Sequence, residues 1–264
     1  MYREFEEYIF NNYDIKLLGI NRKYYHSKRV AILSKKIAEN LNLSLHDVKL
    51  ATTIGLLHDI ARFFEYDLFG KFNSQHFDHG KYGVKLLKED DYIKKYNVSE
   101  EDLDDLYAAI YYHNKYAISR KYQKNKFCKI IRDADKIDII YLVSIHQNII
   151  TTPIDSYTVS PKVYKDFNKG KCIKEKDIKT KGDKILNILS FIYDINYTYS
   201  LKVIKENNYI EEMFNNLGKP ENLKPYFEII NRVINQKIEK EDWLICWIKN
   251  MNINKLKKVN MNIG

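Results

Sequence analysis

Apolar residues recur at intervals of three and four along most of the chain, which is the period of an amphipathic α-helix. Residues 22–41 show the pattern clearly, because one stripe along them carries Val30, Leu33, Ile37 and Leu41. The alternation of apolar and polar residues that is typical of strands is nearly absent. The pattern therefore predicts an all-α protein.

The first half of the chain is predicted to form a series of helices separated by short polar segments. Residues 45–62 are apolar almost all round, which is typical of a central, buried helix, and Ser44 can cap its start. Ser99, with Asp102 three residues later, resembles a capping box. The predicted helices are 2–13, 22–41, 45–62, 79–96, 99–113 and 126–147, with a loop at 66–78 and a polar connection at 114–124.

The second half begins with the longest predicted loop, residues 151–182, because two prolines, two glycines and many lysines fall there. Further helices are predicted at 183–196, 199–216, 223–238 and 241–257. No internal repeat is visible. We therefore predict a core at residues 20–147 and a helical extension at 148–264 that packs on it.

Composition excludes several classes of protein. The chain has 264 residues, 45% of them hydrophobic, with 9 Gly and 4 Pro, so it is neither collagen-like nor mostly disordered. The 3 cysteines form no CxxC pair, and no thiolate zinc site or disulfide framework is predicted. The acidic start MYREFEEYIF is unlike a signal peptide, and no run approaches about eighteen apolar residues. We therefore expect a cytoplasmic protein with no membrane span.

The net charge is +9, from 44 Lys and Arg against 35 Asp and Glu. This excess suits an anionic partner such as a nucleotide, a nucleic acid or a membrane surface. The joint richness in Lys, Asn, Ile and Tyr is also typical of an AT-rich coding sequence, so charge alone does not select a partner.

Ionisable residues interrupt several of the apolar stripes. His26 lies four residues before Val30, His113 ends a stripe and His79 begins one. The six groups that are predicted to point into one interior are His26, His58, Asp59, His79, His113 and Asp135. Burying an unpartnered polar group costs on the order of 2–7 kcal/mol, and a shared divalent metal would satisfy all six at once. One such residue alone is more often a hydrogen-bonded core residue, but six together favour a metal site.

The order of these residues resembles the HD-domain metal-dependent phosphohydrolase superfamily, whose signature is a His, a His-Asp pair in a helix and a later Asp. The matching positions are His26, His58 and Asp59 in GLLHDIARF, and Asp135 in IIRDADKID. The six-ligand form of the family adds two histidines, which match His79 in DHGKYGVKLL and His113 in AAIYYHNKY. The resemblance covers residues 22–140. The segment DINYTYS and the helices after residue 183 are also similar to a bacterial group of HD-domain proteins.

This resemblance implies an HD-domain helical bundle that hydrolyses a phosphate ester or anhydride. In the two-metal form, one ion takes His26, His58, Asp59 and Asp135. The second takes His79, His113 and a bridging Asp59, and a hydroxide between the ions attacks phosphorus. A site with one ion remains the alternative. The metal is Fe, Mn, Zn, Co, Ni or Mg.

Further residues are predicted to bind the substrate or support the ligands. Arg62, one turn after His58, and Lys136, next to Asp135, are predicted to act in catalysis together with Asp59 and to bind phosphate. Lys81 and His76 are predicted as additional substrate contacts; the alternative for Arg62 and both lysines is a solvated side chain. Asp138 is predicted to orient a ligand, Asp78 to cap a helix, and His46 and His146 to be structural or surface residues.

The predicted substrate is a small anionic molecule, most simply a nucleotide. A di-iron oxygenase on the same scaffold would use the same ligand set and stays open as an alternative. A non-catalytic nucleotide- or nucleic-acid-binding protein would explain the lysine-rich segment 162–184, but no nucleic-acid-binding motif accompanies that segment. The sequence does not indicate an oligomeric state or a role for residues 148–264.

Overall fold

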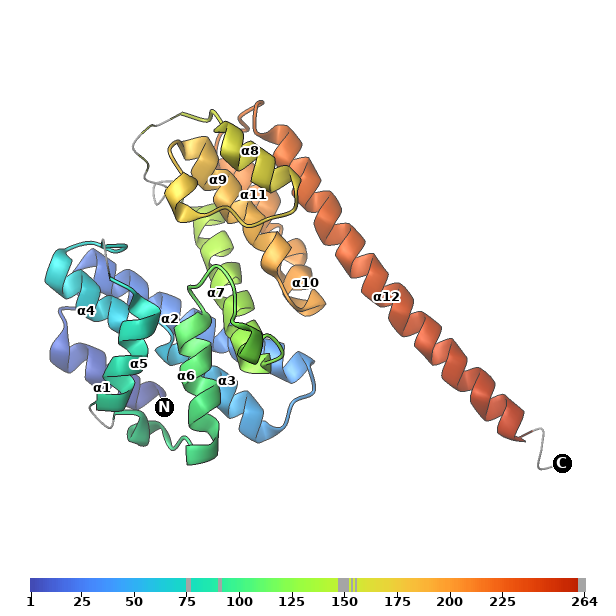
Figure 1. The fold of residues 1–264 in the computed structure, drawn as a ribbon, viewed down its shortest axis with the longest axis horizontal. Helices are drawn as coiled ribbons and strands as arrows, with labels where there is room; N and C mark the ends of the chain where they lie inside the picture. Colours follow the sequence, from blue (N-terminus) through green and yellow to red (C-terminus); the bar gives the residue numbers. More distant parts are fainter. Residues whose placement is uncertain (75–76, 90–91, 147–151, 153, 155, 261–264) are drawn as a thin grey trace. The chain divides into compact units, whose positions relative to one another are not determined.

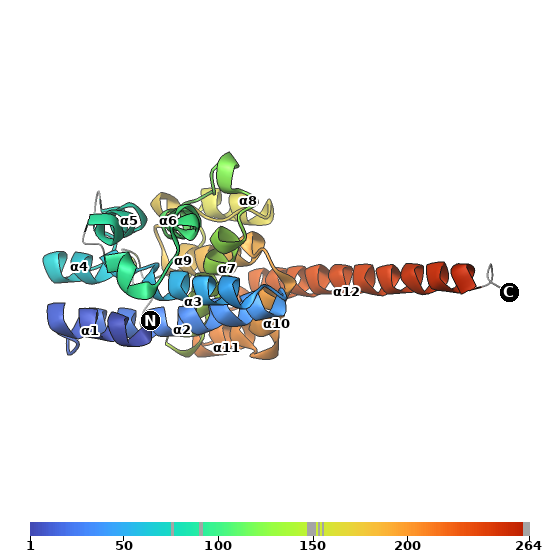
Figure 2. The same ribbon diagram turned by 90° about the horizontal axis from the view of Figure 1, so that it is seen from below.

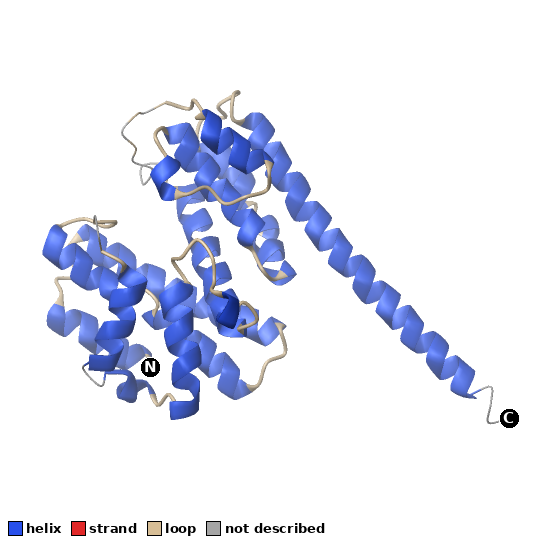
Figure 3. Ribbon diagram, in the orientation of Figure 1, coloured by secondary structure: helices blue, strands red, loops and turns tan. Residues whose placement is uncertain are grey.

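The computed structural model describes the chain apart from residues 75–76, 90–91, 147–151, 153, 155 and 261–264. In this described part, the regular elements are helices joined by loops, with one isolated β-bridge between Ile154 and Thr180 (Figure 3). The predicted all-α class is therefore confirmed.

The chain divides into two compact units. The first unit comprises Met1–Leu142 and Asp194–Ser200, and the second comprises Val143–Tyr193 and Leu201–Gly264. Residues 194–200, which are predicted to belong to the extension, thus cluster with the first unit.

The first unit is built around a buried central helix, α3. Nine of its residues, from Val48 to Leu57, are buried, as the all-round apolar pattern predicts. Helix α2 packs against α3, and α5 packs between α4 and α6 (Figure 1). The helices of this unit are α1 (Tyr2–Asn12), α2 (Leu18–Asn40), α3 (Leu45–Leu57), α4 (Ile60–Phe69), α5 (His79–Glu89), α6 (Leu103–Tyr112) and most of α7 (Lys126–Ile145).

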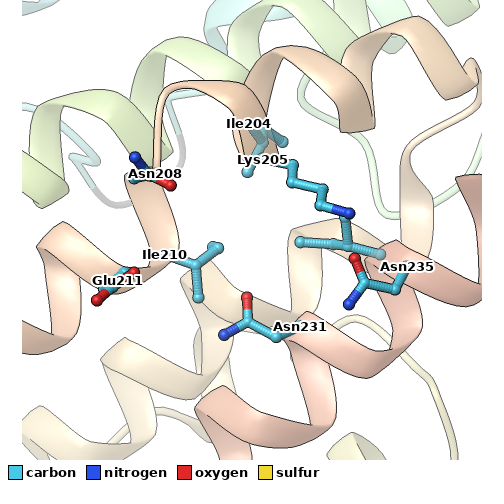
Figure 4. A pocket seen from close by; sticks show the side chains of 8 residues that line it. Ile204, Lys205, Asn208, Ile210, Glu211, Asn231 and Asn235 are labelled. Atoms are coloured by element: carbon cyan, nitrogen blue, oxygen red, sulfur yellow. The ribbon is translucent and has the colours of Figure 1, made fainter.

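The second unit packs short helices against one long helix. Its elements are the end of α7, α8 (Pro161–Asn168), α9 (Lys181–Leu189), most of α10 (Thr198–Glu206), α11 (Tyr209–Asn216) and α12 (Lys224–Asn260), which Figure 2 shows as one unbroken helix. Side chains such as Phe167, Leu186 and Ile230 form its buried core. A cavity of about 260 Å³ lies between α10, α11 and α12, and none of the predicted site residues lines it (Figure 4).

Several predicted boundaries in the first half need correction. The predicted helix 45–62 is interrupted at His58 and Asp59, and α4 continues to Phe69, inside the predicted loop. It ends there because Gly70 takes a left-handed φ of 64°. The predicted helix 79–96 is α5, which ends at Glu89, followed by a short 3₁₀ helix at Tyr92–Tyr96.

The second half departs further from the prediction. Helix α8 lies within the predicted loop 151–182, because Pro161 occupies the first helical position after Ser160 and so starts a helix. The predicted helix 199–216 is broken where Asn208 takes a left-handed φ of 54°. Residues 239–240 contain neither Gly nor Pro, and the two predicted C-terminal helices are one helix, α12.

Candidate metal centre

His58 and Asp59 occupy the break between α3 and α4. Asp59 has φ −107° and ψ 19°, outside the helical region, and the N–H of Arg62 donates to its carbonyl as α4 begins. Neighbouring residues of an unbroken helix point about 100° apart. The break changes this relation and brings Nε2 of His58 within 3.4 Å of Oδ2 of Asp59. Both side chains are almost fully buried.

Four of the predicted ligands form a first donor group. Nε2 of His26, from α2, lies 3.2 Å from Nε2 of His58 and 3.2 Å from Oδ1 of Asp135, from α7. It also lies 3.3 Å from Oδ2 of Asp59. Ligand atoms that bind one ion at about 2.0–2.2 Å lie about 3.0–3.6 Å apart. The group therefore has the spacing of donors around a single divalent ion.

The other two predicted ligands form a second donor group with Asp59. Nε2 of His79, at the start of α5, lies 3.1 Å from Nε2 of His113, at the end of α6. These nitrogens lie 3.6 and 3.4 Å from Oδ1 of Asp59. The two oxygens of Asp59 thus face different donor groups: Oδ2 faces the first and Oδ1 faces the second.

The outer nitrogens of three histidines contact hydrogen-bond acceptors. Nδ1 of His58 lies 2.8 Å from the carbonyl of Gly55, and Nδ1 of His113 lies 2.6 Å from that of Ile110. Nδ1 of His26 lies 2.7 Å from Oδ2 of Asp138. An Nδ1–H that donates outward leaves the Nε2 lone pair of each ring free for a metal. The arrangement of these rings therefore fits a metal site.

Two further residues, Arg29 and Asn114, contribute to the hydrogen bonds at the outer nitrogens of the histidines. Arg29 forms hydrogen bonds of 2.6 and 3.0 Å to the two oxygens of Asp138, so the carboxylate behind His26 is itself held in place. The amide nitrogen of Asn114 lies 3.3 Å from Nδ1 of His79. Asp138 thus contacts His26, a predicted ligand, and its orienting role stays a prediction; the sequence gives no indication of Asn114.

The two donor groups differ in electrostatics. Burial and the charge of Lys23 act to lower the pKa of His26, but hydrogen bonds to Asp135, Asp138 and Asp59 outweigh them and raise it to about 10. The pKa of His58 is also raised, because nearby carboxylates outweigh its burial. Burial lowers the pKa values of His79 and His113, because nearby carboxylates offset less of the effect of burial there.

The two carboxylates of the candidate site remain ionised. Burial acts to raise the pKa of Asp59, but the charges of Lys23 and His58 and further hydrogen bonds hold it well below its usual range. Hydrogen bonds from His26 and His58 do the same for Asp135 against its burial. Buried anionic oxygens beside imidazole nitrogens are a donor set suited to a divalent transition metal.

Lys23 is a cation at this site that the pattern of residues does not predict. Its Nζ lies 2.5 Å from Oδ2 of Asp59, and its side chain is 20% exposed. The available signal was its position three residues before His26, on the same face of α2. Lys23 thus places a partly accessible positive charge beside the carboxylate that the two donor groups share.

Arg62 lies beside the same carboxylate. Its Nε is buried, lies 3.8 Å from Oδ1 of Asp59 and has no hydrogen-bond partner among the residues that the structure describes. Its Nη1 donates to the buried Glu65 at 2.6 Å, and Nη2 donates to Asn73 at 3.0 Å. Arg62 is therefore a fixed, mostly buried guanidinium, and not the solvated helix-end arginine that the sequence left as an alternative.

The remaining predicted substrate residues have different surroundings. Lys136 is mostly buried, and its Nζ lies 2.7 Å from Oδ2 of Asp194. Lys81 is exposed on α5. His76 lies outside the residues that the structure describes.

Three other sequence predictions concern residues outside the donor groups. Asp78 accepts a hydrogen bond from the N–H of Lys81, so it caps α5 as predicted. His46 is exposed and pairs with Asp102 at 2.8 Å, and His146 is exposed. Both are surface histidines, as expected.

Comparison with known proteins identifies the class. Residues 24–140 match the family model of the HD domain, and this match supports membership of the HD-domain metal-dependent phosphohydrolase superfamily. The match contains all six residues of the two donor groups. No curated protein and no solved structure matches the chain. An HD domain implies phosphohydrolase-type chemistry with a divalent metal at the level of the superfamily.

The geometry of the described residues is compatible with such a metal. Two clusters have ligand atoms within 4.8 Å of one another. His26, His58 and Asp135 belong to the first donor group, whereas His58, Asp59 and His113 combine residues of both groups. Among the described residues, no helix has the length and apolar character needed to cross a membrane.

Proposed function

We propose that the chain is a phosphohydrolase that uses two divalent ions to cleave a phosphate ester or anhydride of a nucleotide. The observation that carries this proposal is the position of Asp59, whose two carboxylate oxygens face two different, adjacent donor groups. His26, His58 and Asp135 would hold one ion with Oδ2 of Asp59. His79 and His113 would hold the other with Oδ1.

Divalent ions at such a site activate water as a nucleophile and neutralise charge on the transferring phosphoryl group. The surrounding protein contributes a dry, fixed set of donors. His58 and His113 are held through Nδ1 by backbone carbonyls, so their Nε2 atoms need not reorganise on binding. Fe, Mn, Zn, Co, Ni and Mg are all candidates for the metal.

Two cations support an anionic substrate. Nζ of Lys23 lies 2.5 Å from Oδ2 of Asp59, and Nε of Arg62 lies 3.8 Å from Oδ1 of the same carboxylate. The planar donor fork of Arg62 suits phosphate oxygens, and Lys23 is a flexible point charge. Lys136 is a further proposed phosphate contact, although its present partner is Asp194. Lys81 would contribute only through long-range attraction from its exposed position.

An aromatic ring supports a nucleotide in particular. The centre of the Phe72 ring lies 5.6 Å from Nζ of Lys23 and 5.7 Å from the guanidinium carbon of Arg62. It is half-buried. A partly exposed ring beside two cations offers a stacking surface for a base next to groups that bind its phosphate.

A screen of nucleotides and simple phosphate esters with each of the six metals in turn tests the proposal through phosphate release. We expect Asp59→Asn to abolish the activity, because it removes a charged bridge from both donor groups. Asp67→Asn, an exposed carboxylate on α4, is the matched control and should retain activity. Unchanged hydrolysis of every substrate in Asp59→Asn would refute the proposal. Oxygen consumption without phosphate release would instead support the oxygenase alternative.

A further inference from the structure

Arg132 on α7 is a buried cation near the second donor group, although it is not itself a ligand. Its side chain is 4% exposed. Its Nη1 donates to the carbonyls of Tyr112 and Lys115, at 2.9 and 2.6 Å, and lies 3.4 Å from that of His113. The last carbonyls of a helix have no partner within the helix and favour a nearby cation. Arg132 therefore caps the C-terminal end of α6.

The turn that Arg132 caps carries much of the second donor group. His113 supplies a proposed ligand, and Asn114 contacts the outer nitrogen of His79. Lys115 forms a short ion pair with Asp78, the residue that caps α5 at His79. Both histidines of the second donor group thus depend on residues 113–115.

The other side of Arg132 is held by Asp194. Nε and Nη2 of Arg132 donate to Oδ2 of Asp194 at 3.1 and 2.7 Å. Asp194 lies more than fifty residues beyond the HD-domain match, which ends at residue 140. Its segment is anchored on α7 by Asp133, which accepts hydrogen bonds from the N–H groups of Asn196 and Tyr197 and from the hydroxyl of Ser200.

We propose that Arg132 and Asp194 are positioning residues for the second metal ion. Asp194 orients the guanidinium of Arg132, and Arg132 holds the 113–115 turn so that His113 and His79 face Oδ1 of Asp59. The segment after the HD-domain match would in this way complete a metal site inside it. This inference rests on the proposed two-ion function.

Titration of the metal-free full-length protein with Mn²⁺, followed by calorimetry, tests the inference without an activity assay. Wild type should bind two ions, and His113→Ala identifies the step that belongs to the second donor group. We expect Asp194→Asn to weaken that step by up to about tenfold, the low end of the range for direct partners of a ligand, and to leave the other step unchanged. Asp194→Glu should restore part of the affinity. Asp242→Asn, which breaks an ion pair with Lys202 in the second unit, is the matched control.

Two variants separate this role from the alternatives. Lys136→Met removes the other partner of Asp194 and should leave both binding steps intact, whereas Arg132→Lys should weaken the second step. The inference is overturned if Asp194→Asn binds two ions with wild-type affinity, or if both steps weaken together as the melting temperature falls. It is also overturned if Lys136→Met reproduces the effect. A wild type that binds a single ion refutes the two-ion function and this inference with it.

Discussion

The two donor groups share Asp59 but are supported in different ways. The first contains a second carboxylate, Asp135, and has a third, Asp138, hydrogen-bonded behind His26. The second adds only the neutral imidazoles of His79 and His113 to one oxygen of Asp59. Behind these two rings lie a backbone carbonyl and the amide of Asn114.

This difference has an electrostatic consequence. The carboxylates of the first donor group raise the pKa of His26, while burial lowers the pKa values of both histidines in the second. An ion in the first group would neutralise more negative charge than an ion in the second. We therefore expect the first group to bind its ion more tightly and the second to exchange its ion more readily.

Removal of one ligand from each group should have the largest effect and tests the comparison directly. We expect Asp135→Ala to lose the tighter ion and His113→Ala to lose the weaker one. Each variant should lose more activity than the roughly 10–100-fold that removal of an outer partner costs. Metal content after gel filtration and phosphate release measure the two effects. If His113→Ala lost the tighter ion instead, the proposed order of affinities would be wrong.

Loss of the carboxylate behind the first group should have the next largest effect. Asp138→Asn keeps the size of the side chain but removes the charge that pairs with Arg29 and orients His26. We expect about 10–100-fold weaker binding of the tighter ion, with the weaker ion unaffected. Calorimetric titration with Mn²⁺ resolves the two steps. Equal weakening of both steps would show that Asp138 supports the fold of the whole site and not one group.

The equivalent change behind the second group should be milder. Asn114 is neutral, and its amide lies 3.3 Å from His79, compared with 2.7 Å between Asp138 and His26. We expect Asn114→Ala to reduce the affinity for the more weakly bound ion about tenfold, at the low end of the range for outer partners. The same titration measures it. An effect larger than that of Asp138→Asn would contradict the view that charge makes the first group the better supported one.

The sequence predicts that six ionisable groups share one interior, four of them because they lie on apolar stripes at helical spacing, and the resemblance to the HD-domain superfamily implies how they divide into two ligand sets. His26, His79, His113 and Asp135 needed only the 3.6-residue period to be placed inside the bundle. The period does not show that α3 ends at Leu57, since apolar residues resume at Ile60, directly after His58 and Asp59. A local change of backbone conformation leaves no trace in a pattern of hydrophobicity.

Partners that are distant in sequence were also beyond prediction. Arg29 lies on α2 and pairs with Asp138 on α7, and Arg132 pairs with Asp194 across sixty-two positions. Charged residues are common on helix surfaces, so neither arginine stands out before the tertiary structure brings the pair together. The sequence does not predict helix α8 for a different reason: proline is a turn signal, but it also starts helices.

Two glycines offer the finest test of the comparison, because each lies where helices that carry ligands approach closely. A Cβ on Gly55 would lie 2.8 Å from Cα of Ala31 and 2.9 Å from the carbonyl of Val30, between α3 and α2. A Cβ on Gly80 would lie 2.8 Å from the carbonyl of Tyr111, between α5 and α6. We expect both alanine variants to lower the free energy of unfolding by about 1–3 kcal/mol, with Gly55→Ala the more damaging because α3 is buried and cannot shift. Thermal unfolding of the metal-free proteins measures this, since about 1 kcal/mol corresponds to roughly 2–4 °C in a chain of this size. A larger loss in Gly80→Ala would mean that the second donor group, and not the first, sits on the more rigid pair of helices.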